Sequence, residues 1–261
     1  MRGITMNAIW RNGPAPAATP AGLVRLSGVH KRFGNGQQRV HALHDISFEL
    51  AAGEIVALFG ASGDGKSTLL NIVGLLETPS EGSVVIGNLL ASKMSEQARV
   101  ELRCDMIGYV FQSCNLVPVL TAHENVLLPL MLRARPGPAD MAAKCALATE
   151  LLGQLGLSKQ AGHYPKRLDP SQSQRVAIAR ALVTRPRLVI ADEPGARLNA
   201  RAARLMMDLF VRCQRDDGTA FLISTRDQRQ LVRVDRTLQL CAGRLRAPCA
   251  ASARTTQRLP R

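Results

Sequence analysis

The residues with the clearest chemical potential form a glycine-rich stretch. It reads Gly60-Ala61-Ser62-Gly63-Asp64-Gly65-Lys66-Ser67-Thr68. Glycines let successive backbone N–H groups turn toward phosphate oxygens, and the start of a following helix adds a partial positive charge. A lysine at position 66 would reach the β and γ phosphates, and the Ser67 hydroxyl would ligate Mg²⁺. The stretch therefore predicts a loop that binds the triphosphate of ATP or GTP.

Two adjacent carboxylates follow another apolar run. Residues 188–191 are Leu-Val-Ile-Ala, and Asp192 and Glu193 come next. One carboxylate can hold Mg²⁺ through water while the other polarises an attacking water. An apolar run that ends in Asp-Glu often marks only the end of a strand. Its place about 120 residues after the glycine-rich loop favours a role in hydrolysis.

These groups need a sheet that brings them together. Short β-rich runs occur at residues 23–26, 46–50, 55–59, 84–86, 107–111, 188–192, 219–224 and 237–240. Helical patterns lie between several of them, which predicts an α/β fold with a mainly parallel sheet. Residues 121–184 are helical in pattern and open with Thr121 and Glu124 in capping-box spacing. We therefore expect a helical lobe inserted between two halves of one sheet.

Length and composition limit the number of domains and the kinds of segment that the chain can form. The 261 residues are 46% hydrophobic and 21% charged, enough for one well-buried domain. No apolar run approaches the roughly 18 to 20 residues that cross a membrane. Residues 1–22 contain three prolines and no apolar segment with early positive charge, which predicts a disordered extension and no secretion signal. The domain is expected at 23–245, and the arginine-rich residues 246–261 are expected to form a disordered basic tail.

The cysteines indicate the redox environment of the protein, and the net charge indicates the partners that it could bind. The six cysteines form no CxxC pair, which argues against a zinc site and a disulfide framework and favours reduced thiols in a cytoplasm. The net charge of +14 would suit nucleic acid or an anionic membrane surface. Because the charge is spread along the chain, solvated arginine is the simpler interpretation.

Several further segments resemble the ATP-binding subunit of an ABC transporter. Residues 107–112 (Ile-Gly-Tyr-Val-Phe-Gln), with 115–118 and 120–126, resemble the Q-loop region of ABC ATPases. Residues 174–182 (Gln-Arg-Val-Ala-Ile-Ala-Arg-Ala-Leu) resemble the helix after their signature motif. The match covers about residues 23–245. Residues 33–36 and 40–43 are similar to the lipoprotein-release and macrolide-export branch.

This resemblance implies a P-loop NTPase (RecA-like) core, an antiparallel β subdomain and an inserted helical subdomain at about residues 113–184. It implies ATP and Mg²⁺ as cofactors, with Asp192 and Ser67 at the metal. Gln112 would bind Mg²⁺ and sense the attacking water, and Glu193 would be the general base. Phe33 would stack on adenine, although an aromatic residue buried in the core is the alternative.

The resemblance also implies partners. Two such domains dimerise head to tail, so that each ATP lies between one P-loop and the signature of the partner. The helical lobe would dock a short helix of a separate membrane-spanning subunit. We therefore expect a peripheral protein at the cytoplasmic face of the inner membrane.

Four motifs depart from the family pattern. The signature Leu-Ser-Gly-Gly-Gln is replaced by Leu168-Asp169-Pro170-Ser171-Gln172. Asp169 brings negative charge toward the γ-phosphate of the partner, and Pro170 has no N–H to donate. Arg226 replaces the switch histidine, where it can still donate to the γ-phosphate. Asn199 replaces an aspartate, and Asp64 stands inside the P-loop, where one interpretation is that its side chain points outward.

Three hypotheses follow. The first is an ABC transporter subunit that hydrolyses ATP slowly to drive export or lipoprotein release. The second is a non-hydrolysing nucleotide-binding partner of an intact ABC ATPase, as in a heterodimer. The third, which only the positive charge suggests, is a soluble ABC protein that acts on nucleic acid. Glu193 favours the first hypothesis, while the altered signature and switch favour the second.

Overall fold

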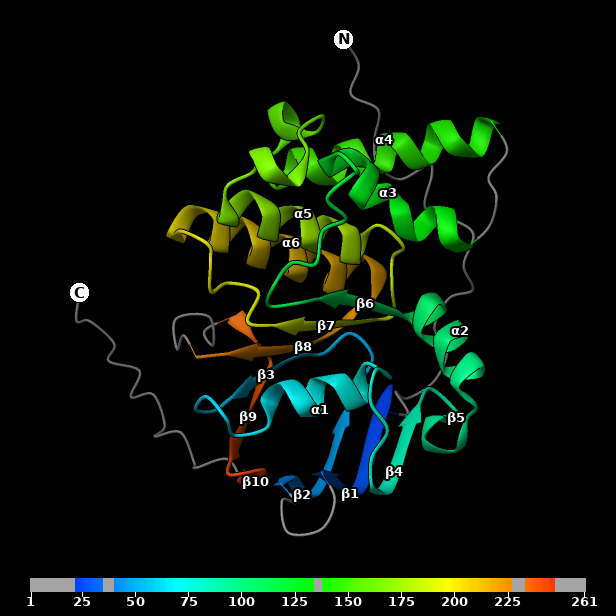
Figure 1. Cartoon of the computed structure of the whole chain (residues 1–261), viewed down its shortest axis with the longest axis vertical. Coiled ribbons are helices and arrows are strands. Elements are labelled where there is room, and N and C mark those ends of the chain that lie inside the picture. The colour runs from blue at the N-terminus through cyan, green and yellow to red at the C-terminus, as the bar shows by residue number, and fades with distance from the viewer. Residues whose placement is uncertain (1–21, 35–39, 134–137, 227–232, 247–261) are drawn as a thin grey trace, which may run out of the picture.

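Two β-sheets and a layer of helices build the computed structural model, which describes residues 22–34, 40–133, 138–226 and 233–246 (Figure 1). An antiparallel sheet has the order β2-β1-β4-β5, and a second sheet has the order β10-β9-β3-β8-β7-β6. The first contains β1 (Val24–Phe33), β2 (Val40–Leu50), β4 (Glu81–Ile86) and β5 (Leu89–Leu90). The second contains β3 (Ile55–Phe59), β6 (Ile107–Val110), β7 (Leu188–Asp192), β8 (Ala220–Thr225), β9 (Arg236–Cys241) and β10 (Arg244–Arg246).

The second sheet is parallel apart from its β10 edge. Strand β3 pairs in parallel with β8 and β9, and β7 pairs in parallel with β6 and β8. Strands β7 and β8 are buried along their whole length, as expected for central strands covered on both faces. Because parallel strands end at one edge, the segments that follow β3, β6, β7 and β8 come together there.

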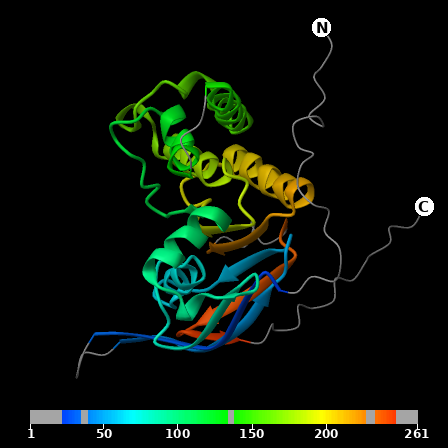
Figure 2. The same cartoon turned by 90° about the vertical axis from the view of Figure 1, so that its right-hand side faces the viewer.

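Helices cover both faces of this sheet. They are α1 (Lys66–Val73), α2 (Glu96–Met106), α3 (Ala122–Arg133), α4 (Pro138–Gln154), α5 (Pro170–Leu182) and α6 (Ala200–Asp217). Helix α1 lies between the two sheets, where Leu69 and Leu70 share one core with both of them. The other face packs against α5 and α6 around Phe210 and Phe221, with α3 and α4 beyond (Figure 2).

The helical lobe lies between β6 and β7 in the chain, as an inserted subdomain requires. Its first helix begins at the predicted capping box: the Thr121 N–H donates to Glu124 Oε2 at 2.8 Å, and the Glu124 N–H donates to Thr121 Oγ1 at 3.2 Å. The α/β class, the mainly parallel sheet and the antiparallel subdomain are therefore confirmed.

Several elements differ from the sequence-based expectation. Strand β1 continues to Phe33, beyond the predicted end at residue 26. The prediction ended too early because irregular pairing between Leu26 and Arg32 interrupts the alternation that marks a strand. Helix α2 and the short strands β5 and β10 were not predicted. Arg246, expected in the tail, ends β10, while residues 1–21 and 247–261 lie outside the described part. Among the described helices, none combines the length and apolarity needed to cross a bilayer.

Candidate nucleotide site

The glycine-rich loop connects β3 to α1 and adopts a conformation that needs glycine. Gly63 has φ 87° and Gly65 has φ 95°, in the left-handed region. A Cβ atom on Gly65 would lie 2.6 Å from the carbonyl oxygen of Ala42, so a side chain there would collide with β2. No side chain caps the start of α1, which leaves its first N–H groups for an external anion.

Lys66 is the first residue of α1 and is only 6% exposed. Its ammonium donates to the carbonyl oxygens of Gly60 at 2.9 Å and Ala61 at 2.7 Å. An ammonium group has three donors, so these contacts leave one for a phosphate oxygen. The lysine is therefore held across the loop before any ligand arrives.

Asp64 does not point outward; it turns back onto the loop. Its carboxylate accepts from the Ala61 N–H at 2.6 Å and from the Ala242 N–H at 3.0 Å. The Gly243 N–H donates to the carbonyl oxygen of Asp64 at 3.1 Å. The outward interpretation is wrong because backbone donors on two sides satisfy both carboxylate oxygens. Asp64 thereby ties the P-loop to the turn between β9 and β10.

We expect Asp64→Ser to strengthen MgATP binding about fivefold. A carboxylate near the phosphates repels them by roughly 1 to 3 kcal/mol at intermediate dielectric, and solvent screening reduces that value. Serine can still accept from the Ala61 N–H, although it loses the contact with Ala242. Calorimetric titration measures the change, with Asp45→Ser on β2 as a control for charge. Weaker binding by Asp64→Ser would mean that the tie to Ala242 matters more than the repulsion.

A serine on the neighbouring strand contacts the Asp192 carboxylate and the backbone of Glu193 at the end of β7. Ser224 is paired with Asp192 in register and donates to Asp192 Oδ1 at 2.6 Å. The same hydroxyl accepts from the Glu193 N–H at 2.9 Å. Glu193 has φ 47°, a strained conformation for a non-glycine residue. Sequence reasoning missed Ser224, whose only signal was a polar residue near the end of a buried strand.

Arg226 contacts the proposed general base. Its Nη2 atom lies 2.5 Å from Glu193 Oε2, and Gln112 Nε2 lies 3.5 Å from the same oxygen. The pKa of Arg226 is raised, first by this hydrogen bond and then by the charge of Glu193. Arg226 therefore occupies the Glu193 oxygen that would accept the proton of an attacking water, so this contact opposes general-base action.

A cavity of about 480 Å³ joins these groups. Its lining residues are Val40, His41, Ala42, His44, Ser62, Gly63, Gly65, Lys66, Ser67, Thr68, Gln112, Glu193, Arg226, Ala242 and Gly243. Gly60, Ala61, Asp64 and Asp192 are not among these lining residues. The volume is in the range of small-molecule sites. Sequence reasoning missed the contributions of β2 and of the β9–β10 turn.

Phe33 stands at the end of β1, paired in register with Val40, which lines the cavity. It is 39% exposed, so the core alternative is wrong. Lys31 Nζ lies 4.9 Å from the centre of its ring. An exposed ring beside the cavity leaves adenine stacking as a prediction.

The donor set suits Mg²⁺. Ser67 and Gln112 offer oxygen atoms at the cavity surface, and Asp192 lies at the end of β7. Oxygen donors are what this hard cation prefers. Among the described residues, no three His, Cys, Asp or Glu side chains are arranged as a metal cluster of their own. These oxygen donors fit a Mg²⁺ ion that also binds the phosphates of a nucleotide.

The altered signature forms a complete helix cap. Asp169 is the N-cap of α5 and accepts from the Gln172 N–H at 2.7 Å, while Gln172 Oε1 accepts from the Asp169 N–H at 3.0 Å. Pro170 occupies the first helical position, where a missing N–H costs the helix nothing. The Asp169 carboxylate therefore already supplies a negative charge at the N-terminus of α5. Asn199 similarly caps α6 by accepting from the Ala202 N–H at 2.9 Å.

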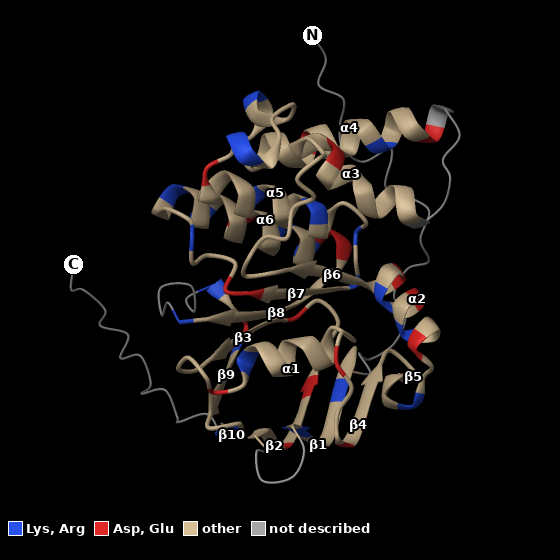
Figure 3. Ribbon diagram, in the orientation of Figure 1, with Lys and Arg blue, Asp and Glu red and all other residues tan. Residues whose placement is uncertain are grey.

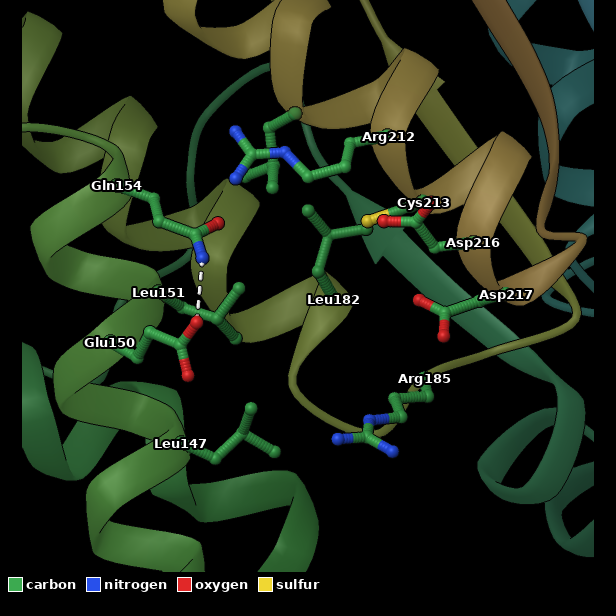
Figure 4. A pocket seen from close by; sticks show the side chains of 11 residues that line it. Leu147, Glu150, Leu151, Gln154, Leu182, Arg185, Arg212, Cys213, Asp216 and Asp217 are labelled. Carbon is green, nitrogen blue, oxygen red and sulfur yellow. Dashed lines mark hydrogen bonds between the residues drawn. The ribbon is translucent and has the colours of Figure 1, made fainter. Parts of the chain in front are cut away.

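A second cavity of about 360 Å³ lies between α4 and α6 (Figure 4). Leu151 and Glu150 line it from α4, and Cys213 and Asp217 from α6. Burial, followed by the charge of Asp217, raises the pKa of Cys213 to about 12, which keeps the thiol protonated. The cavity is at the end of α5 opposite the signature and includes none of the predicted site residues.

Charge does not single out a nucleic-acid face. Lys and Arg are spread over both sheets and the helices, with Asp and Glu among them (Figure 3). Several arginines are paired with acids, including Arg25 with Glu49, Arg32 with Glu81 and Arg236 with Glu54. The described residues therefore lend no support to the nucleic-acid hypothesis.

Comparison with known proteins agrees with this geometry. The family model for ABC transporters matches residues 43–196. The lipoprotein-releasing system ATP-binding protein LolD of Bordetella avium is 42% identical over 222 residues, or 85% of this chain and 95% of the relative. A dimeric MJ0796 cassette in a post-hydrolysis state with ADP and Pi is 36% identical, with a TM-score of 0.82 over 86% of this chain and 97% of the other. A second dimeric structure of MJ0796, a bacterial ABC transporter cassette, is 35% identical with the same TM-score and coverage.

Proposed function

The chain belongs to the family of ABC transporter ATP-binding subunits, and we propose that it drives export or lipoprotein release by a separate membrane subunit. The single observation that carries this is one cavity that joins the P-loop to Gln112 and Glu193. The 42% identity to a lipoprotein-releasing ATP-binding protein supports the branch. The protein would act from the cytoplasmic face of the inner membrane.

Each group in the cavity has a proposed task. The P-loop amides and Lys66 would bind the β and γ phosphates, and Ser67, Gln112 and Asp192 would hold Mg²⁺. Bound ATP supplies the phosphoryl group that is transferred to water. Glu193 orients that water and accepts its proton, which requires Arg226 to leave the carboxylate. The γ-phosphate is a stronger anionic partner for Arg226 than one carboxylate, so nucleotide binding would favour this exchange.

We further propose that hydrolysis is slow in a symmetric dimer. In that arrangement the γ-phosphate of one protomer would face Asp169 and Pro170 of the other. Two negative charges about 5 Å apart at an effective dielectric of about 20 repel by roughly 3 kcal/mol. Because Asp169 already caps α5, that helix end offers little to a second anion.

A heterodimer is the alternative that the altered signature favours. The P-loop side of this chain keeps Lys66, Ser67 and Glu193, whereas its signature side is altered. Paired with an ABC ATPase that has an intact signature, the chain would bind one nucleotide against that signature, and its own altered signature would face the P-loop of the partner. It would then act chiefly as a nucleotide-binding partner, because Arg226 occupies Glu193.

Repair of the signature tests the proposal. We expect the triple variant Asp169→Ser, Pro170→Gly and Ser171→Gly to release phosphate from MgATP about tenfold faster than the wild type. The change removes the Asp169 charge and with it the repulsion estimated above; a tenfold gain corresponds to about 1.4 kcal/mol, or about half of that estimate. Serine remains a good N-cap, so α5 should stay intact.

The readout is continuous phosphate detection with the full chain, and thermal denaturation verifies the fold of the variant. The matched control is Ser95→Asp, which changes the N-cap of α2, a helix that does not line the cavity. Release that stays equally slow in the repaired protein would contradict signature-limited hydrolysis. The heterodimer hypothesis would then require an intact partner for turnover.

A further inference from the structure

Three of the five histidines in the chain meet beside the phosphate loop. His30 Nδ1 on β1 lies 3.3 Å from His41 Nε2 on β2, and their ring centres are 5.4 Å apart. The ring of His44, also on β2, lies 3.6 Å from that of His41 at 43°. All three side chains are half-buried. We call His30, His41 and His44 the histidine cluster.

The histidine cluster borders the nucleotide cavity. His41 and His44 line it together with Gly63, Gly65 and Lys66. Two backbone contacts hold β2 in place there: the Ala42 carbonyl oxygen packs against Gly65, and the His44 N–H donates to the Gly243 carbonyl oxygen at 2.8 Å. A positive charge on His41 would therefore attract an anion bound at the phosphate loop.

The surroundings of His41 lower the pKa of its imidazole. The neighbouring titratable or charged groups are His30 and Arg32 on β1, His44 on β2, Glu81 on β4, Lys66 on α1, and Glu193 and Arg226 across the cavity. Partial burial lowers the pKa of His41, and His44, Arg32 and His30 lower it further. An anionic ligand in the cavity would instead raise the pKa of His41, because it favours the protonated imidazole. A protonated His41 could donate from Nε2 to His30 Nδ1, so the cluster can hold one added proton.

We propose that the histidine cluster is a proton-linked part of the nucleotide site, in which protonated His41 strengthens the binding of an anionic nucleotide. The inference deepens the proposed function and rests on the nucleotide binding assigned there. Linkage sets the direction: a ligand that raises the pKa of a group binds more tightly as pH falls through that pKa.

The test is calorimetric titration of the full chain with MgATP at pH 8 and pH 6. We expect wild-type affinity to rise about fivefold on acidification, the size expected for one partly solvated charge near the phosphates. His41→Gln should bind with nearly the same affinity at both pH values. His30→Gln, which removes the proton acceptor without touching the cavity lining, should also reduce the pH dependence. Since every titration uses one nucleotide, its own protonation cancels in the comparison.

His123→Gln in the helical lobe is the matched control and should follow the wild type. Its ring contacts Thr149 and the Cys145 carbonyl oxygen, away from the cavity. In parallel, NMR titration of the imidazole C–H signals should show that MgATP raises the pKa of His41. Equal pH dependence in wild type and His41→Gln would overturn the inference while leaving nucleotide binding intact. No binding by the wild type at either pH would instead overturn the proposed function.

Discussion

Replacing Lys66 with alanine is expected to lower the affinity for MgATP by at least about a hundredfold, or about 2.7 kcal/mol. The Lys66 ammonium donates hydrogen bonds to the Gly60 and Ala61 carbonyl oxygens, and the side chain lines the cavity. A buried, fixed ammonium binds phosphate through charge-assisted hydrogen bonds and needs no reorganisation. Its loss removes the positive side-chain charge of the loop, while the negative charge of Asp64 stays.

Calorimetric titration measures this change, and Lys159→Ala, an exposed lysine in the helical lobe, is the control. Because Lys66 also holds the loop together, Lys66→Met serves as a second variant that keeps the apolar stem. Thermal denaturation of both variants shows whether the fold survives. Undiminished affinity in a folded variant would exclude the assigned phosphate site.

Replacing Glu193 with glutamine is expected to slow phosphate release by at least about a hundredfold, while MgATP affinity stays equal or rises. The amide oxygen can still accept from Gln112 and Arg226, so the geometry should persist. An amide cannot take the proton of the attacking water, which removes general-base catalysis, commonly worth 10²–10⁴-fold. It also removes a negative charge from the cavity.

The assay is single-turnover phosphate release at saturating MgATP. Asp208→Asn, which removes a carboxylate from the salt bridge with Arg233 on the surface of α6, is the control. If Glu193→Gln releases phosphate at the wild-type rate, Glu193 is not the base. If the wild type itself releases none, the non-hydrolysing hypothesis gains support, because binding would then be the only activity of this chain.

Local patterns identified much of the fold. The strand–loop–helix of the P-loop, the buried run before Asp192 and the capping box at Thr121 each appear where the sequence predicts them. These features depend on interactions within about five residues, which periodicity and capping chemistry describe well. Strand β1 was cut short in prediction because its bulges disturb the alternation. Strands β5 and β10 are too short to carry a periodic signal.

What the sequence alone determined is the chemistry available: a phosphate loop, two carboxylates, and an altered signature and switch. Only the tertiary structure decided which of these groups meet. It turns Asp64 onto the backbone of Ala242, places Arg226 on Glu193, and joins Ser224 to the Asp192 carboxylate and the Glu193 N–H. It also gathers three histidines at the cavity. These contacts join residues far apart in the chain, so strand register and side-chain direction create them, and no local spacing encodes either.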